Sequence, residues 1–285
     1  MEKIITIGKE DSLYPELLRK IKNPPEKLFC VGNTGLLEKR KLAVIGSRKV
    51  SNYGRWVTEN MARRASENNI VIVSGMARGA DTYAHIGALM GGGNTIAVLG
   101  TAIDECYPAE NRDIKRRIEE KGLVISEYPP GSKTHKWNFV KRNRIVAGLS
   151  EKVIVTEAGL NSGALITAEM AAEYGRDVMA VPGNINNQYN IGSNRLLAEG
   201  AMPVINIEDP VYLMGITPDI QKSVLEGLGG DEKRIMKLLM TGEEMTVDNI
   251  AGTLGLTTGQ VNAIVTILEI KGCVHNSLGK VFVAK

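Results

Sequence analysis

Short apolar segments alternate with helix-length segments between residues 42 and 206, and this alternation constrains the fold more than any other feature of the chain. The expected strands are residues 42–45, 70–73, 95–99, 123–126, 153–156, 178–181 and 203–206. The expected helices are residues 53–67, 82–90, 111–121, 163–174 and 192–199. Strands and helices that alternate in this way predict an α/β fold, an extended Rossmann-like, mostly parallel sheet with helices on both faces.

Residues 71–89 form the most informative unit of this pattern, a strand followed by a glycine-containing turn and a helix start. Ser74, Gly75 and Gly79 surround the basic residue Arg78, and Asp81 is expected to cap the helix. Backbone N–H groups and the positive end of a helix dipole then lie close together, which favours an anion such as phosphate. The loop matches neither the dinucleotide-binding nor the Walker A pattern, so we expect no cofactor.

Ligands of parallel α/β sheets bind beyond the carboxyl ends of the strands. Several turns should therefore meet at one rim, namely residues 46–48, 74–79, 100–101, 126–127 and 157–159. Arg48 directly follows a strand on a Gly46-Ser47 turn and should point away from the sheet toward a ligand. The alternative is a salt bridge from Arg48 to Glu157 or Asp104.

The chain has no acidic residue between Glu127 and Glu151, although this window is rich in basic and aromatic side chains. It contains Lys133, His135, Lys136, Trp137, Phe139, Lys141, Arg142 and Arg144. Cations bind phosphates and aromatic rings stack on unpaired bases, a mixture that suits single-stranded nucleic acid. A solvated loop with two core aromatics is the alternative, but the position of the window beside the rim favours a binding pocket.

Two further groups of residues allow two interpretations each. Asp81 and His85 are spaced to pair on one helix face, either as a catalytic couple with Ser74 as nucleophile or as structural support of the pocket, which we favour. Ser162 and Gly163 open a helix and either cap it or form a second anion site. No pattern of metal ligands occurs, so we expect no metal site.

Charge and cysteine content add little about partners but indicate a compartment. The net charge of +3 is too small to identify a partner. Cys30, Cys106 and Cys273 lie far apart and form no C-x-x-C pair, as is usual in a reducing compartment. With no apolar run long enough to span a membrane and no leader-like N-terminus, the chain is expected to be cytoplasmic.

The pattern predicts four parts. These are a short lead-in (1–38), the Rossmann-like single-strand-binding domain (39–216), a linker (217–230) and a small winged-helix domain (231–285). The expected recognition helix of the last domain begins with residues 257–262, none of which is basic. We therefore expect this domain to contact protein or to bind nucleic acid weakly, rather than to read a DNA sequence.

Several long motifs, taken together, resemble the bacterial DNA-processing protein A (Smf) family over about residues 10–210. They are Gly46-Ser-Arg48, the stretch from Ser74 to His85, Tyr107-Pro-Ala-Glu-Asn111, Arg142-Asn-Arg-Ile-Val-Ala-Gly-Leu149, Glu157-Ala with the stretch from Ser162 to Ala168, and Ala180-Val-Pro-Gly183. The resemblance implies a non-enzymatic recombination mediator that binds single-stranded DNA, forms homodimers and helps to load the RecA recombinase during natural transformation.

The resemblance also implies roles for individual residues. Ser47 and Arg48 would hold backbone phosphate, Lys133 or Lys136 with Arg142 would extend the phosphate path, and Phe139 would contact a base. Asn143 and Arg144 fit the Arg-Asn-Arg element of the family. The full set expected to bind DNA is Gly46, Ser47, Arg48, Ser74, Gly75, Arg78, Gly79, Lys133, Lys136, Phe139, Arg142, Asn143, Arg144, Ser162 and Gly163.

Three departures from the family pattern stand out. Val140 replaces a proline that usually follows the phenylalanine, Ala80 replaces a common isoleucine, and the lead-in leaves no room for the helical domain of many members. Two other functions remain open from the residues. One is a nucleotide phosphoribohydrolase that uses Glu157 and Glu169 as acid and base. The other is a sequence-specific regulator that acts through the winged helix, which its lack of basic residues disfavours.

Overall fold

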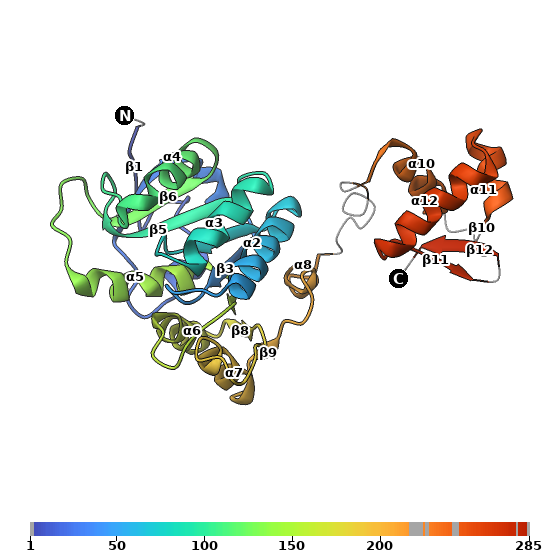
Figure 1. Cartoon of the computed structure of the whole chain (residues 1–285). Coiled ribbons are helices and arrows are strands. Elements are labelled where there is room, and N and C mark those ends of the chain that lie inside the picture. The colour runs from blue at the N-terminus through green and yellow to red at the C-terminus, as the bar shows by residue number, and fades with distance from the viewer. Residues whose placement is uncertain (1–2, 217–224, 226–227, 241–244, 278, 284–285) are drawn as a thin grey trace. The chain divides into compact units, whose positions relative to one another are not determined.

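A nine-stranded sheet forms the centre of the first of two compact units, Met1–Thr217 and Pro218–Lys285 (Figure 1). The computed structural model describes residues 3–216, 225, 228–240, 245–277 and 279–283. The strands lie in the order β1-β2-β6-β5-β4-β3-β7-β8-β9. Their bounds are Ile5–Gly8 (β1), Lys27–Gly32 (β2), Lys41–Ile45 (β3), Val71–Ser74 (β4), Thr95–Ala102 (β5), Leu123–Tyr128 (β6), Lys152–Val155 (β7), Asp177–Ala180 (β8) and Met202–Pro203 (β9).

The seven neighbouring strands β6-β5-β4-β3-β7-β8-β9 all pair in parallel. Beyond β6, β2 and then β1 extend the sheet in antiparallel pairing. The chain proceeds outward from β3 through β4 and β5 to β6, and then returns to place β7, β8 and β9 on the other side of β3. The order of the strands therefore reverses between β3 and β7. In doubly wound sheets such a reversal opens a crevice at the carboxyl ends of the two strands.

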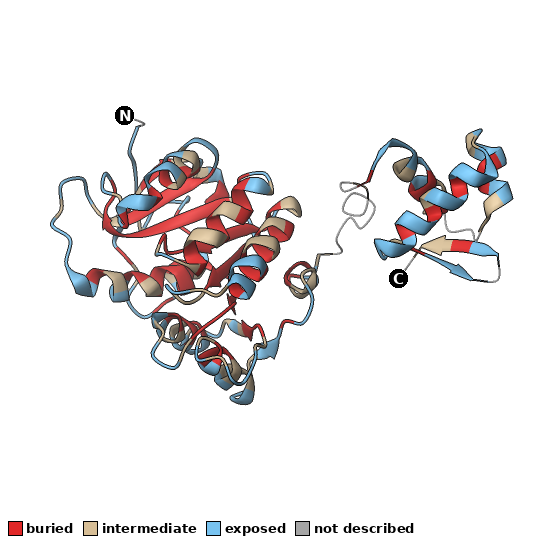
Figure 2. Ribbon diagram, in the orientation of Figure 1, coloured by how far each residue is buried: buried red, intermediate tan, exposed pale blue. Residues whose placement is uncertain are grey.

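Helices cover both faces of this sheet. Their bounds are Glu16–Arg19 (α1), Asn52–Glu67 (α2), Ala80–Met90 (α3), Arg112–Lys121 (α4), Lys136–Leu149 (α5), Gly163–Glu173 (α6), Ile191–Ala198 (α7) and Asp209–Leu213 (α8), with short 3-10 turns at Thr34–Leu37 and Ala109–Asn111. Alternate residues of β3 enter opposite cores: Leu42 and Val44 pack with α2 and α3, whereas Ala43 and Ile45 pack with α5 and α6. The strand interior is apolar throughout because both of its faces are buried (Figure 2).

The expected α/β class is confirmed, and most expected strands and helices lie within a few residues of the observed ones. The sequence interpretation assigned no helix to α5 or to the short α8. Residues 133–144, for which only a binding pocket or a solvated loop was considered, lead into and occupy α5. Two buried arginines, Arg142 and Arg144, interrupt the apolar face of this helix, so it lacks the periodic stripe by which a helix is recognised.

The segment expected to be a lead-in contributes two strands to the same sheet. β2 pairs with β6 from Phe29↔Ser126 to Gly32↔Leu123, and β1 pairs with β2. Leu18 of α1 and Tyr14, just before this helix, are buried in the core that α5 covers. At the other edge, β9 is much shorter than the expected strand 203–206.

The second unit contains three helices and a three-stranded sheet in the order β10-β12-β11, among its described residues. The elements are Gly230–Leu239 (α10), Met245–Thr246 (β10), Val247–Leu254 (α11), Thr258–Ile270 (α12), Val274–Ser277 (β11) and Lys280–Val283 (β12). Ile235, Ile250, Val265 and Val281 meet in its own core. This is the expected winged-helix layout. Of the expected linker, residues 217–224 and 226–227 lie outside the described residues.

Within the described residues, no single helix has the length and apolar composition needed to cross a membrane. The pair Val247–Leu254 and Thr258–Ile270 passes the same test only when the two helices are taken together, and it is bent by 113° at its break. Val261, Val265 and Leu268 of this pair are buried in the core of the winged helix.

Candidate functional site

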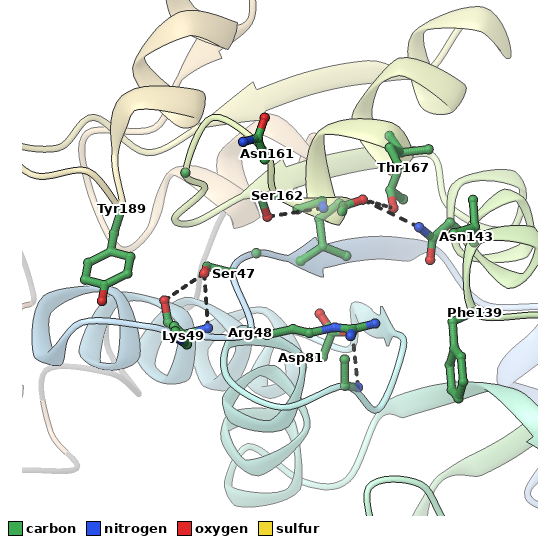
Figure 3. Close-up of a pocket in the computed structure, with 18 of the residues that line it drawn as sticks. Ser47, Arg48, Lys49, Asp81, Phe139, Asn143, Asn161, Ser162, Thr167 and Tyr189 are labelled. Atoms are coloured by element: carbon green, nitrogen blue, oxygen red, sulfur yellow. Dashed lines mark hydrogen bonds between the residues drawn. The ribbon is translucent and has the colours of Figure 1, made fainter. Parts of the chain in front are cut away.

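A cavity of about 800 Å³ lies at the carboxyl ends of β3 and β7, where the strand order reverses. Its walls come from the loop after β3, the loop after β7 with the start of α6, the loop after β8, and one side of α5. In Figure 3, Tyr189 lies at one end of this cavity and Phe139 at the other, with Arg48 between them. We call this cavity the switch-point pocket. Of the turns predicted to meet at one rim, 46–48 and parts of 74–79 and 157–159 line this cavity, whereas 100–101 and 126–127 do not.

The loop after β3 is held in place by hydrogen bonds on both of its sides. The Ser47 backbone N–H donates to the Glu157 carbonyl over 2.7 Å, and the Ser47 carbonyl accepts from the Ala80 N–H. Within the loop, the Ser47 hydroxyl donates to the Lys49 carbonyl and accepts from the Lys49 N–H (Figure 3). These bonds use the Ser47 side chain to order the turn that carries Arg48 and Lys49.

Arg48 and Lys49 are exposed at this pocket, and neither has a carboxylate within ion-pair distance in the part of the chain that the structure describes. The alternative salt bridges of Arg48 are not formed. Glu157 is fully buried and accepts hydrogen bonds from the backbone N–H and hydroxyl of Ser51, the residue that caps α2. Asp104 accepts from the Gly131 N–H. Both cations on the β3 loop are therefore available to an anionic ligand.

Arg142 reaches the pocket from α5 and is almost completely buried. One guanidinium nitrogen lies 3.9 Å from the Asp81 carboxylate, and Nε has no hydrogen-bond partner. Burial lowers the pKa of Arg142 while Asp81 opposes this effect. A Cβ on Gly75 would lie only 1.2 Å from the guanidinium, so this position must be glycine for Arg142 to fit.

Asp81 does not cap α3 as expected. The N-cap is Gly79, and the Asp81 carboxylate instead accepts from the backbone N–H groups of Gly75 and Ala77. Burial raises the pKa of Asp81 and the Arg142 charge lowers it. Asp81 thus ties the loop after β4 to the base of the pocket, next to the one cation that α5 buries there.

Phe139, Asn143 and the first turn of α6 complete the walls of the pocket. Phe139 packs on Gly100 and lies 5.0 Å, centroid to centroid, from the ring of Tyr107. The Asn143 amide donates to the Gly163 carbonyl (Figure 3). The Ser162 hydroxyl accepts from the Ala164 N–H as the cap of α6, so the two interpretations of Ser162 are compatible: it caps the helix and lies on the pocket wall.

Some residues of the expected set lie elsewhere. Arg78 is exposed outside the pocket and forms a two-pronged ion pair with Glu110, at 2.6 and 2.9 Å. Ser74 is fully buried and donates to the Val44 carbonyl. Lys133 precedes α5 and Lys136 is its first residue; both side chains are exposed, and neither lines the pocket. Arg144 lines a different cavity on the other side of α5, where it pairs with Glu127.

His85 and Asp81 do not form a catalytic couple. The His85 ring is fully buried and its Nδ1 lies 2.8 Å from the Thr95 hydroxyl, while the expected nucleophile Ser74 is bonded to Val44. Burial, together with the charge of Arg142, lowers the pKa of His85 to about 3. The imidazole is therefore neutral at physiological pH and belongs to the packing between α3 and β5.

This low pKa predicts a loss of stability in acid. The unfolded chain binds a proton at His85 near pH 6.5, whereas the folded chain does so only near pH 3. The contribution of neutral His85 to the free energy of unfolding is therefore complete above pH 6.5 and is lost progressively as the pH falls toward 3. Between about pH 7 and pH 5 the free energy of unfolding should fall by about 2 kcal/mol through His85. Urea unfolding at both pH values measures the difference.

The matched variants are His85→Gln and His135→Gln, because His135 is exposed. His85→Gln should lose most of this pH dependence, whatever its absolute stability, and His135→Gln should keep it. An unchanged pH dependence in His85→Gln would contradict the assignment.

Sequence reasoning missed the loop after β8. Gln188 and Tyr189 line the pocket together with Ile191 at the start of α7, and Asn161 lines it from the loop after β7. The signal was present, because residues 184–190 are rich in amide side chains and follow a strand at the same rim. The same rule that selected the loop after β3 would have selected this one. Lys49 was also missed, although it directly follows Arg48.

The described residues contain no group of three metal-ligating side chains. The pocket instead offers two exposed cations, one buried cation, helix N-terminal N–H groups and amide side chains, with an aromatic ring at either end. This arrangement binds anionic groups and stacks on planar rings.

Comparisons with known proteins point to one family along most of the chain. The model of the DNA recombination-mediator protein A family matches residues 3–215, and that of the DprA winged helix domain matches residues 221–280. The DNA processing protein DprA of Streptococcus pneumoniae is 47% identical over 199 residues, which cover 70% of each chain. Protein Smf of Synechocystis is 33% identical over an alignment that covers 95% of this chain and 77% of that protein.

Two solved structures share the fold. The DNA processing protein A of Streptococcus pneumoniae superposes with a TM-score of 0.70 at 44% identity, over 74% of each chain. That of Helicobacter pylori, whose structure describes its binding of single-stranded DNA, superposes with a TM-score of 0.69 at 34% identity, over 75% of this chain and 96% of that one. With the family model spanning the whole sheet and its pocket, this chain belongs to the DNA recombination-mediator protein A family.

Proposed function

We propose that the switch-point pocket binds the backbone and bases of single-stranded DNA, without base specificity, and that the protein acts as a recombination mediator in natural transformation. The observation that carries this proposal is the convergence of Arg48, Lys49 and Arg142 on one cavity that has Phe139 and Tyr189 at its ends. Phosphates bind the cations, and bases stack on the aromatic rings.

The shape of the pocket favours a single strand over a duplex. Stacking on Phe139 requires a base whose face is free, and the bases of a duplex are already stacked on one another. The cations reach the cavity from separate elements, the loop after β3 and helix α5, so phosphates must enter a concavity to meet them. A flexible single strand can do so at little cost, whereas a duplex would have to deform.

The expected binding residues divide into three groups under this proposal. Those that contact the strand are Gly46, Ser47, Arg48, Phe139, Arg142, Asn143, Ser162 and Gly163. Gly75, Gly79 and His85 shape the pocket from behind, and Asp81 supports the pocket from within its lining. Ser74, Arg78, Lys133, Lys136 and Arg144 lie outside it.

No covalent chemistry is part of the proposed function. The rival enzyme needs Glu157 and Glu169 as acid and base near the pocket. The Glu157 carboxylate is held by Ser51 at the start of α2, and Glu169 is exposed on α6 and does not line the cavity. If nucleoside monophosphates released free base in the presence of the protein, the enzyme would be favoured instead.

Two partners belong to the proposal, a second copy of this chain and the RecA recombinase. Membership in a recombination-mediator family supports both. We propose that the interface between copies lies near residues 195–202, where the short edge strand β9 carries the exposed Met202, with the exposed Ile205 two residues beyond the strand. An unpaired edge with exposed apolar side chains is suited to pairing with another chain. Light scattering of the protein, alone and with RecA, tests both partners.

The central experiment is a salt series of binding to oligothymidylate and to a duplex of the same length. Three cations in contact with phosphates predict that the logarithm of affinity falls against the logarithm of salt with a slope of about −2 for the single strand. The duplex should bind more weakly at every salt concentration. Equal affinity for the two forms, or a slope near zero, would contradict the proposed function.

A further inference from the structure

A second cavity of about 800 Å³ lies on the other side of α5, beside the strands β1, β2 and β6. Basic side chains dominate its lining. They are Lys9, Lys22, Lys27, Lys141 and Arg144, against the acidic residues Glu26 and Glu127. The side chains that line this cavity therefore have a net formal charge of +3. Phe29 of β2, half-buried, adds an aromatic surface. We call this cavity the second pocket.

Most of this positive charge is not neutralised by protein carboxylates. Within the described part of the chain, Lys9, Lys22 and Lys27 have no carboxylate at ion-pair distance. Glu127 is shared between Lys141, at 3.3 Å, and Arg144, at 2.5 Å. One carboxylate thus faces two cations at the base of the second pocket, and three lysines surround them.

Arg144 provides a separate indication that an anion belongs here. It is only 7% exposed, and one guanidinium nitrogen, Nη2, donates to Glu127. The other, Nη1, is buried and has no hydrogen-bond partner. A buried donor of a charged group that lacks an acceptor costs free energy, so its position beside a cavity indicates that an acceptor arrives with a ligand.

Helix α5 is a wall shared by the two pockets. Phe139, Val140 and Asn143 line the switch-point pocket, whereas Lys141 and Arg144, three residues apart on one side of the helix, line the second pocket. Val140 and Lys141 are both exposed, so the helix surface that carries them between the two pockets is open to solvent. A helix is about 10–12 Å across with its side chains, a distance that a short stretch of single strand can cover.

We propose that the second pocket binds backbone phosphates of the same single strand after it leaves the switch-point pocket and crosses the N-terminal half of α5. This inference rests on the proposed function of the switch-point pocket. Lys22 and Lys27 approach the strand as mobile point charges, and Arg144 offers Nη1 to a phosphate oxygen while Nη2 keeps Glu127. Phe29 provides a surface on which a base can stack.

The test uses the full chain and the double variant Lys22→Gln/Lys27→Gln, because both lysines are exposed and their loss leaves the core intact. The charge-matched control is Lys39→Gln/Lys121→Gln, two exposed lysines outside both pockets. Binding is measured by fluorescence anisotropy with oligothymidylates of about 4 and about 16 nucleotides, the range of single-strand site sizes. Arg48→Ala is measured in parallel.

For the longer oligonucleotide, the double variant should lose about tenfold in affinity, and its salt slope should become shallower by about 1.4. The shorter oligonucleotide, which fills only the switch-point pocket, should bind as it does to the unmodified protein. The control variant should leave both affinities and both slopes unchanged within error.

Two outcomes would overturn the second pocket alone. In the first, the double variant binds the longer oligonucleotide as the control does, while Arg48→Ala still weakens it. In the second, the double variant weakens both lengths equally, which would place the two lysines at the first site or make their effect a general one of charge. If Arg48→Ala has no effect on either length, the proposed function itself fails.

Discussion

Replacing Arg48 with alanine is expected to weaken the binding of single-stranded oligonucleotide by about 10- to 100-fold, because a hydrogen bond to a charged partner contributes about 1.5–3 kcal/mol. The side chain is exposed at the switch-point pocket and has no protein carboxylate as partner among the described residues. Its loss therefore removes a phosphate contact without removing a contact of the fold. The free energy of unfolding should change by less than about 0.5 kcal/mol.

The matched control is Arg78→Ala. Arg78 follows the neighbouring strand β4 and is also exposed, but its guanidinium is occupied by Glu110 and it lies outside the pocket. We expect near-normal affinity for this variant. Anisotropy titrations of both variants, with urea unfolding to verify the fold, make the comparison. If the two variants lose affinity equally, binding would depend on the general charge of the rim and not on the pocket.

Gly79→Ala is expected to have the largest effect on stability, about 3 kcal/mol or more. Gly79 has φ 75° and ψ −126°, a conformation that side chains other than glycine strongly disfavour. An added Cβ would also lie 2.3 Å from the Ser47 carbonyl oxygen and 2.7 Å from backbone atoms of Arg48. These are backbone atoms that cannot rotate away, so relief requires the whole loop after β3 to move.

The same variant should also lose affinity for single-stranded DNA, because the loop that must move carries Ser47 and Arg48. The control is Gly175→Ala, at φ 69° with no atom within 4 Å of the added Cβ. Gly175 has a positive φ without the close contact, so we expect about 1 kcal/mol of destabilisation and unchanged binding. Urea unfolding and anisotropy separate the two effects. Similar destabilisation in both variants would show that the contact with the β3 loop contributes nothing.

The candidate site was predictable from sequence where a residue directly follows a strand. Ser47 and Arg48 sit at the end of β3 and had to lie at the rim, and they do. Arg78 satisfied the same rule after β4 but turns to Glu110, a residue 32 positions later in the chain. A strand end predicts where a backbone arrives, whereas the direction of a long side chain depends on which partner lies near it.

Helix α5 is a second case in which the sequence did not predict the direction of the side chains. The sequence singled out the basic window, but residues two positions apart on a helix point to nearly opposite sides, so Arg142 and Arg144 line separate cavities. Treating the window as one binding element placed all of its cations in one pocket. The buried Asp81 beside Arg142 and Glu127 beside Arg144 come from distant parts of the chain, and only folding brings them to α5.

By itself the sequence determined the α/β class, the winged helix and the strand ends at which the switch-point pocket lies, because hydrophobic periodicity and turn residues act over short stretches of chain. Only the tertiary structure decided which cations face the same cavity. It placed α5 between two pockets, paired Arg78 with Glu110 and left Arg48 without a carboxylate at ion-pair distance among the residues that the structure describes. The physical reason is that the availability of a charge depends on the groups within a few ångströms of it, and those groups come from segments far apart in sequence.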